Sequence, residues 1–235
     1  MIDIHCHILH GVDDGAKDLE ESVSMARIAY EDGIRDIIVT PHFKMEYLTL
    51  ADVVHRKLEE LERELERQRI GVRLHPGNEV QLVNADFVAE HIKKRSFAYL
   101  GRPGTHMLIE QRWSDYDPAT PEIVERLLDA GVTPVLAHPE RHAFFRDDPE
   151  LVPMLVELGM WTQVSADSLV GNFGADAQKY GRKLIQAGLA HTIATDSHNV
   201  NRKPNLSAGM AVFEELAGAG ARAELEARMR SIVAE

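Results

Sequence analysis

Short β-branched runs alternate with helical patterns along almost the whole chain, and this alternation limits the fold more than any other feature. Each repeat is on the order of 30 residues, the size of a strand–helix unit. Such alternation predicts a parallel sheet covered by helices. The strand-like runs lie at 2–4, 36–40, 71–75, 105–110, 133–137, 161–164 and 192–194. Helices are expected at 18–29, 51–70, 84–93, 121–130, 149–158, 175–187, 207–216 and 223–233.

Seven units without a dinucleotide-binding glycine fingerprint favour a closed barrel. The expected fold class is α/β, as a distorted, TIM-like (β/α)7 barrel, and an open doubly wound sheet is the alternative. No linker or break in composition divides the 235 residues, so we expect residues 1–235 to form a single domain.

The helical pattern at 51–70 carries apolar residues at heptad-like spacing, namely Val54, Leu58, Leu61 and Leu65. This pattern predicts a helix that packs on the barrel. A self-association face is the alternative, which leaves a homo-oligomer open.

Charge and cysteine content exclude several classes of protein. The formal net charge is −12, and no block of lysines and arginines interrupts it, so nucleic-acid binding is not expected. Cys6 is the only cysteine, which rules out a disulfide within the chain and fits a reducing compartment. No apolar run reaches membrane-spanning length, and the N-terminus lacks a signal-type segment. We therefore expect a cytoplasmic protein with no direct membrane insertion.

Residue types that bind metals stand at the carboxyl ends of six of the seven strands. In a barrel these ends converge on one face, where active sites form. Because residues two apart on a strand point the same way, His5 and His7 should aim together, as should Asp196 and His198, while Cys6 points away. The full set is His5, His7, His42, Glu79, Glu110, His138, Asp196 and His198.

Nitrogen and oxygen donors without a thiolate suit Mn, Fe, Zn or Co. The donors are too many for one ion, so we expect a site that holds several metals bridged by a carboxylate. Crowded carboxylates would otherwise repel one another, and cations remove that penalty.

The order of these motifs resembles the polymerase and histidinol phosphatase (PHP) superfamily, and most closely its bacterial manganese-dependent protein-tyrosine phosphatases of capsule and exopolysaccharide synthesis. The resemblance runs from residue 1 to about 204. Three segments resemble the tyrosine-phosphatase branch in particular: VDDG at 12–15, HPER at 138–141 and QVSADSLVGNFG at 163–174. The other matching motifs are DIHCH at 3–7, TPH at 40–42, GNE at 77–79, LIE at 108–110 and TDSH at 195–198.

Membership implies a PHP fold, three divalent metal ions, most typically Mn with Fe, Zn or Co as alternatives, and hydrolysis of phosphotyrosine on an autophosphorylated bacterial tyrosine kinase. Arg141 and Arg202 match positions that grip the phosphate, and a surface ion pair is the alternative for each. The metal sets implied by the family are His5, His7, Glu79 and Asp196; His42 and His198 with Asp14 or Asp13; and Glu110 and His138 with Glu79 bridging.

The implied reaction is attack on phosphorus by a water that the metals activate, with a phenolate as leaving group. A cysteine-based phosphatase would carry an arginine six residues after the nucleophile, but Val12 stands at that offset from Cys6. Rival hypotheses are a phosphatase for a small monoester such as histidinol phosphate, a phosphodiesterase, and a non-catalytic metal-binding regulator.

Several neighbouring residues allow two readings. His10 stands where the family often has proline, and a loop variant is favoured over an extra ligand. Four aromatic residues near the motifs could form a slot for an aromatic leaving group or could pack on the barrel: Phe43, Tyr47, Phe144 and Phe145.

Overall fold

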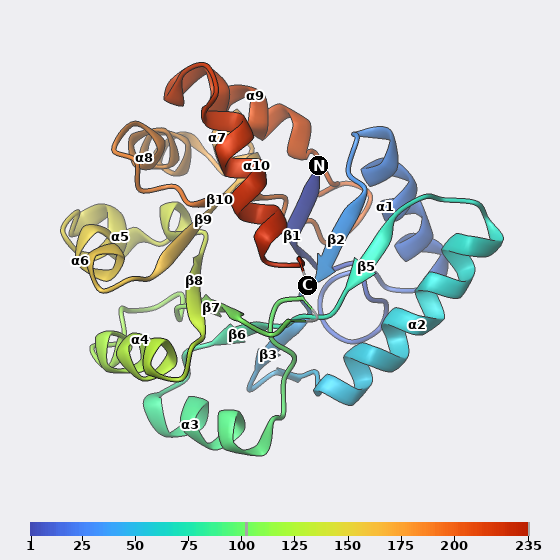
Figure 1. Ribbon diagram of the computed structural model, residues 1–235, viewed down its shortest axis with the longest axis horizontal. Helices are drawn as coiled ribbons and strands as arrows, with labels where there is room; N and C mark the ends of the chain where they lie inside the picture. The colour runs from blue at the N-terminus through green and yellow to red at the C-terminus, as the bar shows by residue number, and fades with distance from the viewer. Residues whose placement is uncertain (102, 235) are drawn as a thin grey trace.

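A computed structural model describes residues 1–101 and 103–234 and shows a distorted barrel surrounded by helices (Figure 1). The strands form two hydrogen-bonded sheets, and all neighbouring strands are parallel except for one antiparallel pair at an edge of the larger sheet. The smaller sheet has the order β1 (Ile2–Cys6), β2 (Asp36–Val39) and β5 (Arg73–His75). The larger has the order β10 (Thr192–Ala194), β9 (Trp161–Ser165), β8 (Thr133–Ala137), β7 (His106–Glu110), β6 (Glu79–Gln81), β3 (His42–Lys44) and β4 (Tyr47–Leu48).

The two sheets together close the cylinder. The chain runs directly from β2 into β3 and from β5 into β6, so each of these pairs occupies one barrel position. On the other side, Cys6 bridges to Ser197, and the His7 N–H donates to the Ser197 carbonyl at 2.9 Å. Seven positions therefore surround the axis within the described residues, and the predicted (β/α)7 class is confirmed.

Proline accounts for the distortion. Pro41 separates β2 from β3, and Pro76 separates β5 from β6. A proline has no N–H to donate to a sheet ladder, so pairing stops and resumes after it. The Glu79 N–H then donates to the Pro41 carbonyl at 3.2 Å, where the pairing of β6 with β3 begins.

The helices lie outside the strands, and two of them begin at side-chain caps. Asp18 accepts the N–H of Glu21, and Asn84 accepts the N–H of Phe87. The helices are α1 (Leu19–Glu31), α2 (Ala51–Arg67), α3 (Ala85–Lys94), α4 (Thr120–Asp129), α5 (Ala143–Asp147), α6 (Leu151–Glu157), α7 (Ala166–Val170), α8 (Ala175–Gln186), α9 (Leu206–Ala217) and α10 (Ala221–Ser231).

The apolar stripe of α2 is buried. Val54, Leu58, Leu61 and Leu65 are at most 4% exposed, and the helix contacts α1 and β5. The prediction that this helix packs on the barrel is confirmed. Burial of the stripe also means that it does not offer a free apolar face for self-association.

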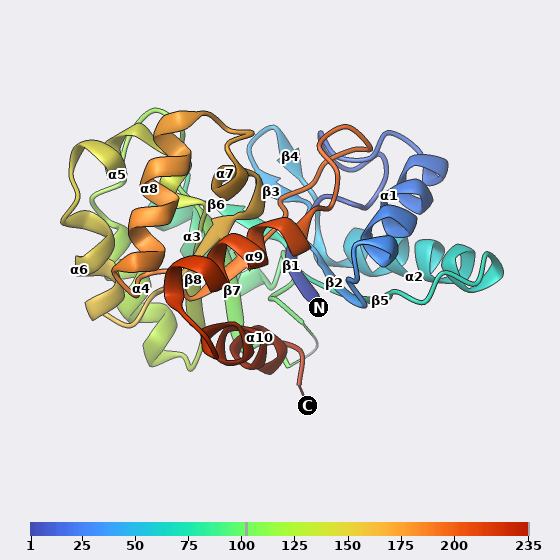
Figure 2. The same ribbon diagram turned by 90° about the horizontal axis from the view of Figure 1, so that it is seen from above.

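Figure 2 shows the two edges of the barrel. The β3–β4 hairpin and the loop between β10 and α9 lie at one edge, while α10 and the C-terminus lie at the opposite edge. No helix among the described residues has both the length and the apolar character needed to cross a membrane. The expectation that residues 1–235 form one domain stays a prediction.

Candidate metal centre and active site

The carboxyl ends of the strands surround a polar pocket of about 270 Å³. Its walls contain nine of the eleven site residues predicted from the sequence, and the other two, His5 and His7, are buried against wall carboxylates. The pocket is lined by Asp14, His42, Lys44, Glu79, Glu110, Trp113, His138, Arg141, Asp196, His198 and Arg202.

His5 and His7 aim together, as the strand alternation predicts. Their Nε2 atoms lie 3.1 Å apart, and each is within 3.3 Å of Asp196 Oδ1. Glu79 is 3.3 Å from the first ring and 3.5 Å from the second. Cys6 points the other way, where its Sγ lies 3.1 Å from Ser197 Oγ. Two imidazole nitrogens and two carboxylates therefore converge on one point. This set of donors suits a divalent cation.

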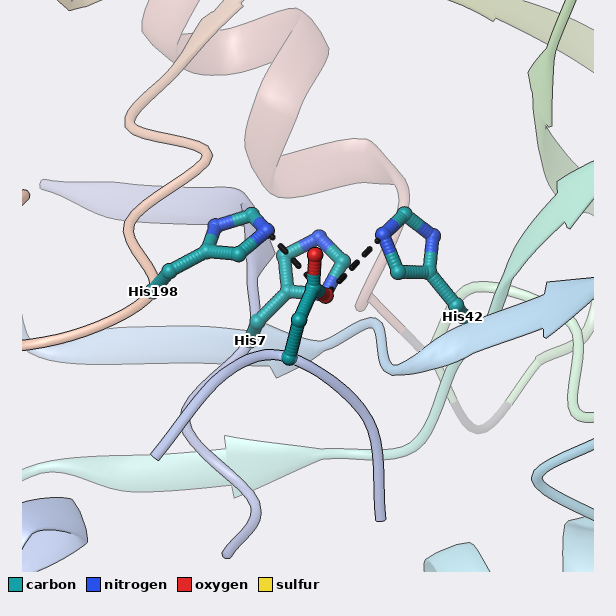
Figure 3. Close-up of side chains that lie close together, drawn as sticks. His7, His42 and His198 are labelled. Atoms are coloured by element: carbon teal, nitrogen blue, oxygen red, sulfur yellow. Dashed lines mark ion pairs between the residues drawn. The ribbon is translucent and has the colours of Figure 1, made fainter. Parts of the chain in front are cut away.

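A second cluster lies beside the first. Asp14 Oδ1 is 3.3 Å from His42 Nε2 and 3.6 Å from His198 Nε2. The ring of His7 stacks on that of His198, with centroids 3.9 Å apart. Figure 3 shows the rings of His7, His42 and His198 drawn together from three separate segments.

Glu79 occupies the centre of the site. Its Oε1 lies 3.0 Å from His138 Nε2, and its Oε2 lies 2.8 Å from His42 Nδ1. The contact between Glu79 Oε2 and His42 Nδ1 has the length of an ion pair but not the geometry of a hydrogen bond. These two atoms are buried, and neither has a hydrogen-bond partner among the described residues. Glu110 Oε1 is 3.9 Å from His138 Nε2. Buried lone pairs that face one another without a shared hydrogen fit a cation between them.

The far nitrogens of the first two rings are held by hydrogen bonds. His7 Nδ1 donates to Asp13 Oδ2 at 2.7 Å, and His5 Nδ1 donates to the side-chain amide oxygen of Gln163, Oε1, at 2.9 Å. Asp13 also accepts the N–H of His42. Such outer contacts fix the ring orientation and leave the other nitrogen free for a metal. The geometry therefore favours Asp14 as the metal ligand from this loop and Asp13 as the residue that holds the ring of His7 in place.

Electrostatics show how much negative charge is concentrated here. Burial lowers the pKa of His5, but the nearby carboxylates of Glu79 and Asp196 raise it more, to about 9. Burial and the charge of Glu79 raise the pKa of Glu110 to about 7. Burial and Arg141 lower the pKa of His138 to about 4. A bound divalent cation would satisfy these carboxylates and imidazoles together.

Two arginines lie at one side of the pocket. Arg141 and Arg202 each donate to Asp196 Oδ2, and both side chains remain partly exposed. Their ion pairs with Asp196 therefore lie beside the cluster of histidines and carboxylates and not on a remote part of the surface. His138 and Asp196 adopt left-handed backbone with φ of 31° and 50°. Strain of this kind at non-glycine residues is typical of functional positions.

The aromatic alternatives separate by burial. Phe43 and Phe145 are fully buried and pack among other rings, so they belong to the core. Tyr47 lies nearer the site, with its ring stacked on His42 at 6.2 Å. His10 contacts Lys57 and Glu60 on α2, away from the cluster, as a loop variant would.

Sequence reasoning missed two aromatic residues that contact the arginines of the pocket, Trp113 and Phe173. Trp113 is 49% exposed and lines the pocket, with its indole stacked 4.4 Å from the ring of His142. Its position a few residues after Glu110, past the end of β7, was the available signal. Gln163 was also missed, although it lies in β9 and begins the segment 163–174.

Comparison with known proteins agrees with this geometry. Tyrosine-protein phosphatase YwqE of Bacillus subtilis is 36% identical over 204 residues, which cover 86% of this chain and 79% of that protein. Crystal structures of YwqE and of CpsB from Streptococcus pneumoniae, described as unique metal-dependent tyrosine phosphatases, include a chain that matches 99% of this one, and 94% of its own length, with a TM-score of 0.94 and 33% identity.

A more distant match concerns the fold alone. HisK of Listeria monocytogenes, a proposed histidinol phosphatase, has a TM-score of 0.53 at 12% identity, over 86% of this chain and 97% of that one. The expected PHP-type fold and phosphatase branch are confirmed. Residues 1–230 match the family described as capsular polysaccharide synthesis, CpsB/CapC. The chain therefore belongs to the CpsB/CapC family of capsular polysaccharide synthesis proteins.

Proposed function

We propose that this chain is a metal-dependent tyrosine-protein phosphatase that acts in polysaccharide synthesis. One observation carries the proposal: a cluster of histidines and carboxylates that suits several cations opens beside two arginines in a single pocket. Cations and guanidinium groups are the two kinds of charge that stabilise a transferring phosphoryl group. Similarity to YwqE, which is named as a tyrosine-protein phosphatase, points to the same substrate class.

The proposed metal centre holds three divalent ions, with Mn²⁺ as the first choice. His5, His7, Glu79 and Asp196 would hold one ion; His42, His198 and Asp14 a second; and Glu110 and His138 a third, with Glu79 bridging. The contacts between donor atoms within each set are 3.0 to 3.9 Å long. They support this division, because ligands of one ion lie within about 5 Å of one another.

When bound, the metals would supply Lewis acidity and lower the pKa of water toward neutrality. Arg141 and Arg202 would bind the phosphoryl oxygens through their planar donor groups. A substrate phosphate in the pocket would meet both guanidinium groups together, since both donate to the same atom, Asp196 Oδ2, and therefore lie close to each other. The chain thus orients the phosphate before any bond breaks.

The leaving group places little demand on the protein. A tyrosine phenolate departs far more easily than an alkoxide, so a strong general acid is less necessary. Cys6 takes no part, because its side chain is buried on the far side of β1 and burial raises its thiol pKa. The reaction would therefore not pass through a phosphocysteine.

The proposed substrate is a phosphorylated tyrosine on a protein, and an autophosphorylated bacterial tyrosine kinase fits a capsule-synthesis family. The shape of the site supports a protruding side chain on a larger partner. The pocket is small, and exposed apolar residues lie on the segments beside it: Met45 on the turn after β3, Trp113 after β7 and Val200 after β10.

Metal depletion and restoration would test this function. The protein is stripped with a chelator, and Mn²⁺, Zn²⁺, Fe²⁺ and Co²⁺ are added back one at a time. Each form is assayed with a phosphotyrosine peptide, histidinol phosphate and a phosphodiester. We expect no turnover without metal and a preference for the peptide with Mn²⁺. Faster turnover of histidinol phosphate or of the diester would overturn the proposed substrate class, and turnover without metal would overturn the metal centre.

A further inference from the structure

The loop between α7 and α8 contains an aromatic residue that contacts both arginines of the pocket. The guanidinium carbon of Arg141 lies 4.2 Å from the centroid of the Phe173 ring, and that of Arg202 lies 4.9 Å from the same centroid. One ring therefore holds two cations that would otherwise repel each other. Cation–π contacts at such distances are attractive, and more so where water is partly excluded.

The backbone around Phe173 is built to hold the ring in place. Gly171 and Gly174 both have φ near 91°, a conformation open to glycine, so the chain turns sharply on each side of Asn172 and Phe173. Asn172 donates its backbone N–H and its side-chain amide to Asp167, at 2.9 and 2.6 Å. Asp167 is buried. The backbone that carries Phe173 is thus held by contacts that do not involve the arginines.

The second anchor of the arginines is shared with the metal centre. Both guanidinium groups donate to Asp196 Oδ2, while Asp196 Oδ1 faces His5 and His7. In the proposed function Asp196 is a metal ligand, and a cation on its carboxylate weakens that carboxylate as an acceptor for arginine. The contact with Phe173 does not involve Asp196 and would persist when metal binds.

From these contacts we propose that Phe173 is a positioning residue that keeps Arg141 and Arg202 aimed into the pocket for phosphate. The inference rests on the proposed function and adds a part to it: an aromatic clamp on the phosphate-binding pair. Because Phe173 acts through the arginines, it should affect the binding of the phosphate and not the binding of the group to which the phosphate is attached.

The two arginines should depend on the ring to different degrees. Arg141 also lies over Trp113, with its guanidinium carbon 5.0 Å from that centroid. For Arg202, Phe173 supplies the one cation–π contact found among the described residues. Loss of the Phe173 ring should therefore make the guanidinium group of Arg202 more mobile than that of Arg141.

Binding of inorganic phosphate to the Mn²⁺-loaded protein, measured by calorimetry, tests the proposal without relying on turnover. Phe173→Leu and Phe173→Met remove the ring but keep apolar bulk, and Phe173→Tyr keeps the ring. We expect the phosphate Kd to rise about tenfold in the first two variants and to stay within about twofold of wild type in the third. Having two variants without the ring keeps the test open if one of them folds poorly. Separate titrations should show unchanged Mn²⁺ affinity.

Double-mutant cycles then test the asymmetry. The coupling of Phe173→Leu with Arg202→Lys should exceed its coupling with Arg141→Lys. Unchanged phosphate binding in Phe173→Leu and Phe173→Met would overturn the proposal. So would weaker turnover of the phosphotyrosine peptide with an unchanged phosphate Kd, because that pattern means contact with the tyrosine ring. Failure of the wild-type protein to hydrolyse the peptide, with phosphate binding intact, would instead count against the proposed function alone.

Discussion

The Nδ1 atom of His7 donates to Asp13 Oδ2 at 2.7 Å, and this one contact decides which nitrogen of His7 faces the pocket. With Nδ1 occupied, Nε2 points at Asp196 Oδ1, 3.3 Å away. Asp13 also accepts backbone N–H groups of Gly15 and His42. Its neighbour Asp14 faces His42 and His198 instead. Two adjacent acids of one loop thus have different tasks.

Asp13→Asn should weaken metal binding without removing a ligand. The amide can no longer accept as a carboxylate does, so His7 loses the support for its orientation and basicity. Loss of an outer-shell carboxylate typically costs about 10- to 100-fold in metal affinity. Calorimetric titration with Mn²⁺ measures the effect. Asp14→Asn is the matched comparison and should abolish one binding step. An Asp13→Asn protein with wild-type affinity would show that the His7 contact is incidental.

Glu79→Gln should abolish turnover with the fold intact. Glu79 lies within 3.5 Å of His5, His7, His42 and His138, so its charge serves the whole cluster. Glutamine has the same shape but cannot bridge cations with two anionic oxygens, and a fall in kcat of at least about a thousandfold is expected. Phosphotyrosine peptide hydrolysis and far-ultraviolet circular dichroism together make the check. Retained activity in the folded variant would refute the ligand assignment.

Much of the fold and the site could be predicted from the sequence because their signals are periodic or local. Alternating strand and helix patterns predict the barrel, and a barrel places strand ends on one face. His5 lies near the end of β1, and His42, His138 and Asp196 come within three residues of the ends of β2, β8 and β10. Their convergence therefore needs no knowledge of distant contacts. The caps at Asp18 and Asn84 depend only on residues within three positions.

The rest depends on contacts between distant segments. Several elements are at most five residues long, too short for periodicity to be visible. They are the strands β3, β4 and β6, the helices α5 and α7, and the 3-10 turn at 139–141. Phe173 meets Arg141 and Arg202 only because three loops converge, and no spacing in the chain predicts such a contact. Gln163 reaches His5 across 158 residues for the same reason.

Cys6→Ala should leave the reaction unchanged. The thiol is fully buried, burial raises its pKa, and its Sγ contacts Ser197 on the side away from the pocket. We expect kcat and KM for the peptide within about twofold of wild type, since the nucleophile is not a thiolate. Iodoacetamide should likewise fail to inhibit the folded enzyme. A large loss of activity, at unchanged metal content, would revive a cysteine mechanism.

Acid stability should depend on Asp36, at the barrel edge opposite the site. Partial burial raises its pKa, but hydrogen bonds from Arg73 and His75 outweigh burial and hold it below its ordinary value. The unfolded chain then binds protons more readily, so this stabilisation is complete above about pH 4 and is lost as pH falls through the folded pKa. Asp36→Asn should lower the free energy of unfolding by about 1 kcal/mol at pH 7, because Arg73 is largely exposed, and by much less at pH 2.5. Urea titrations at both pH values measure the difference.

Glu90→Gln, which breaks an exposed pair with Lys94, should cause no measurable change at either pH. An equal loss for Asp36→Asn at both pH values would mean that packing, and not charge, is what Asp36 contributes.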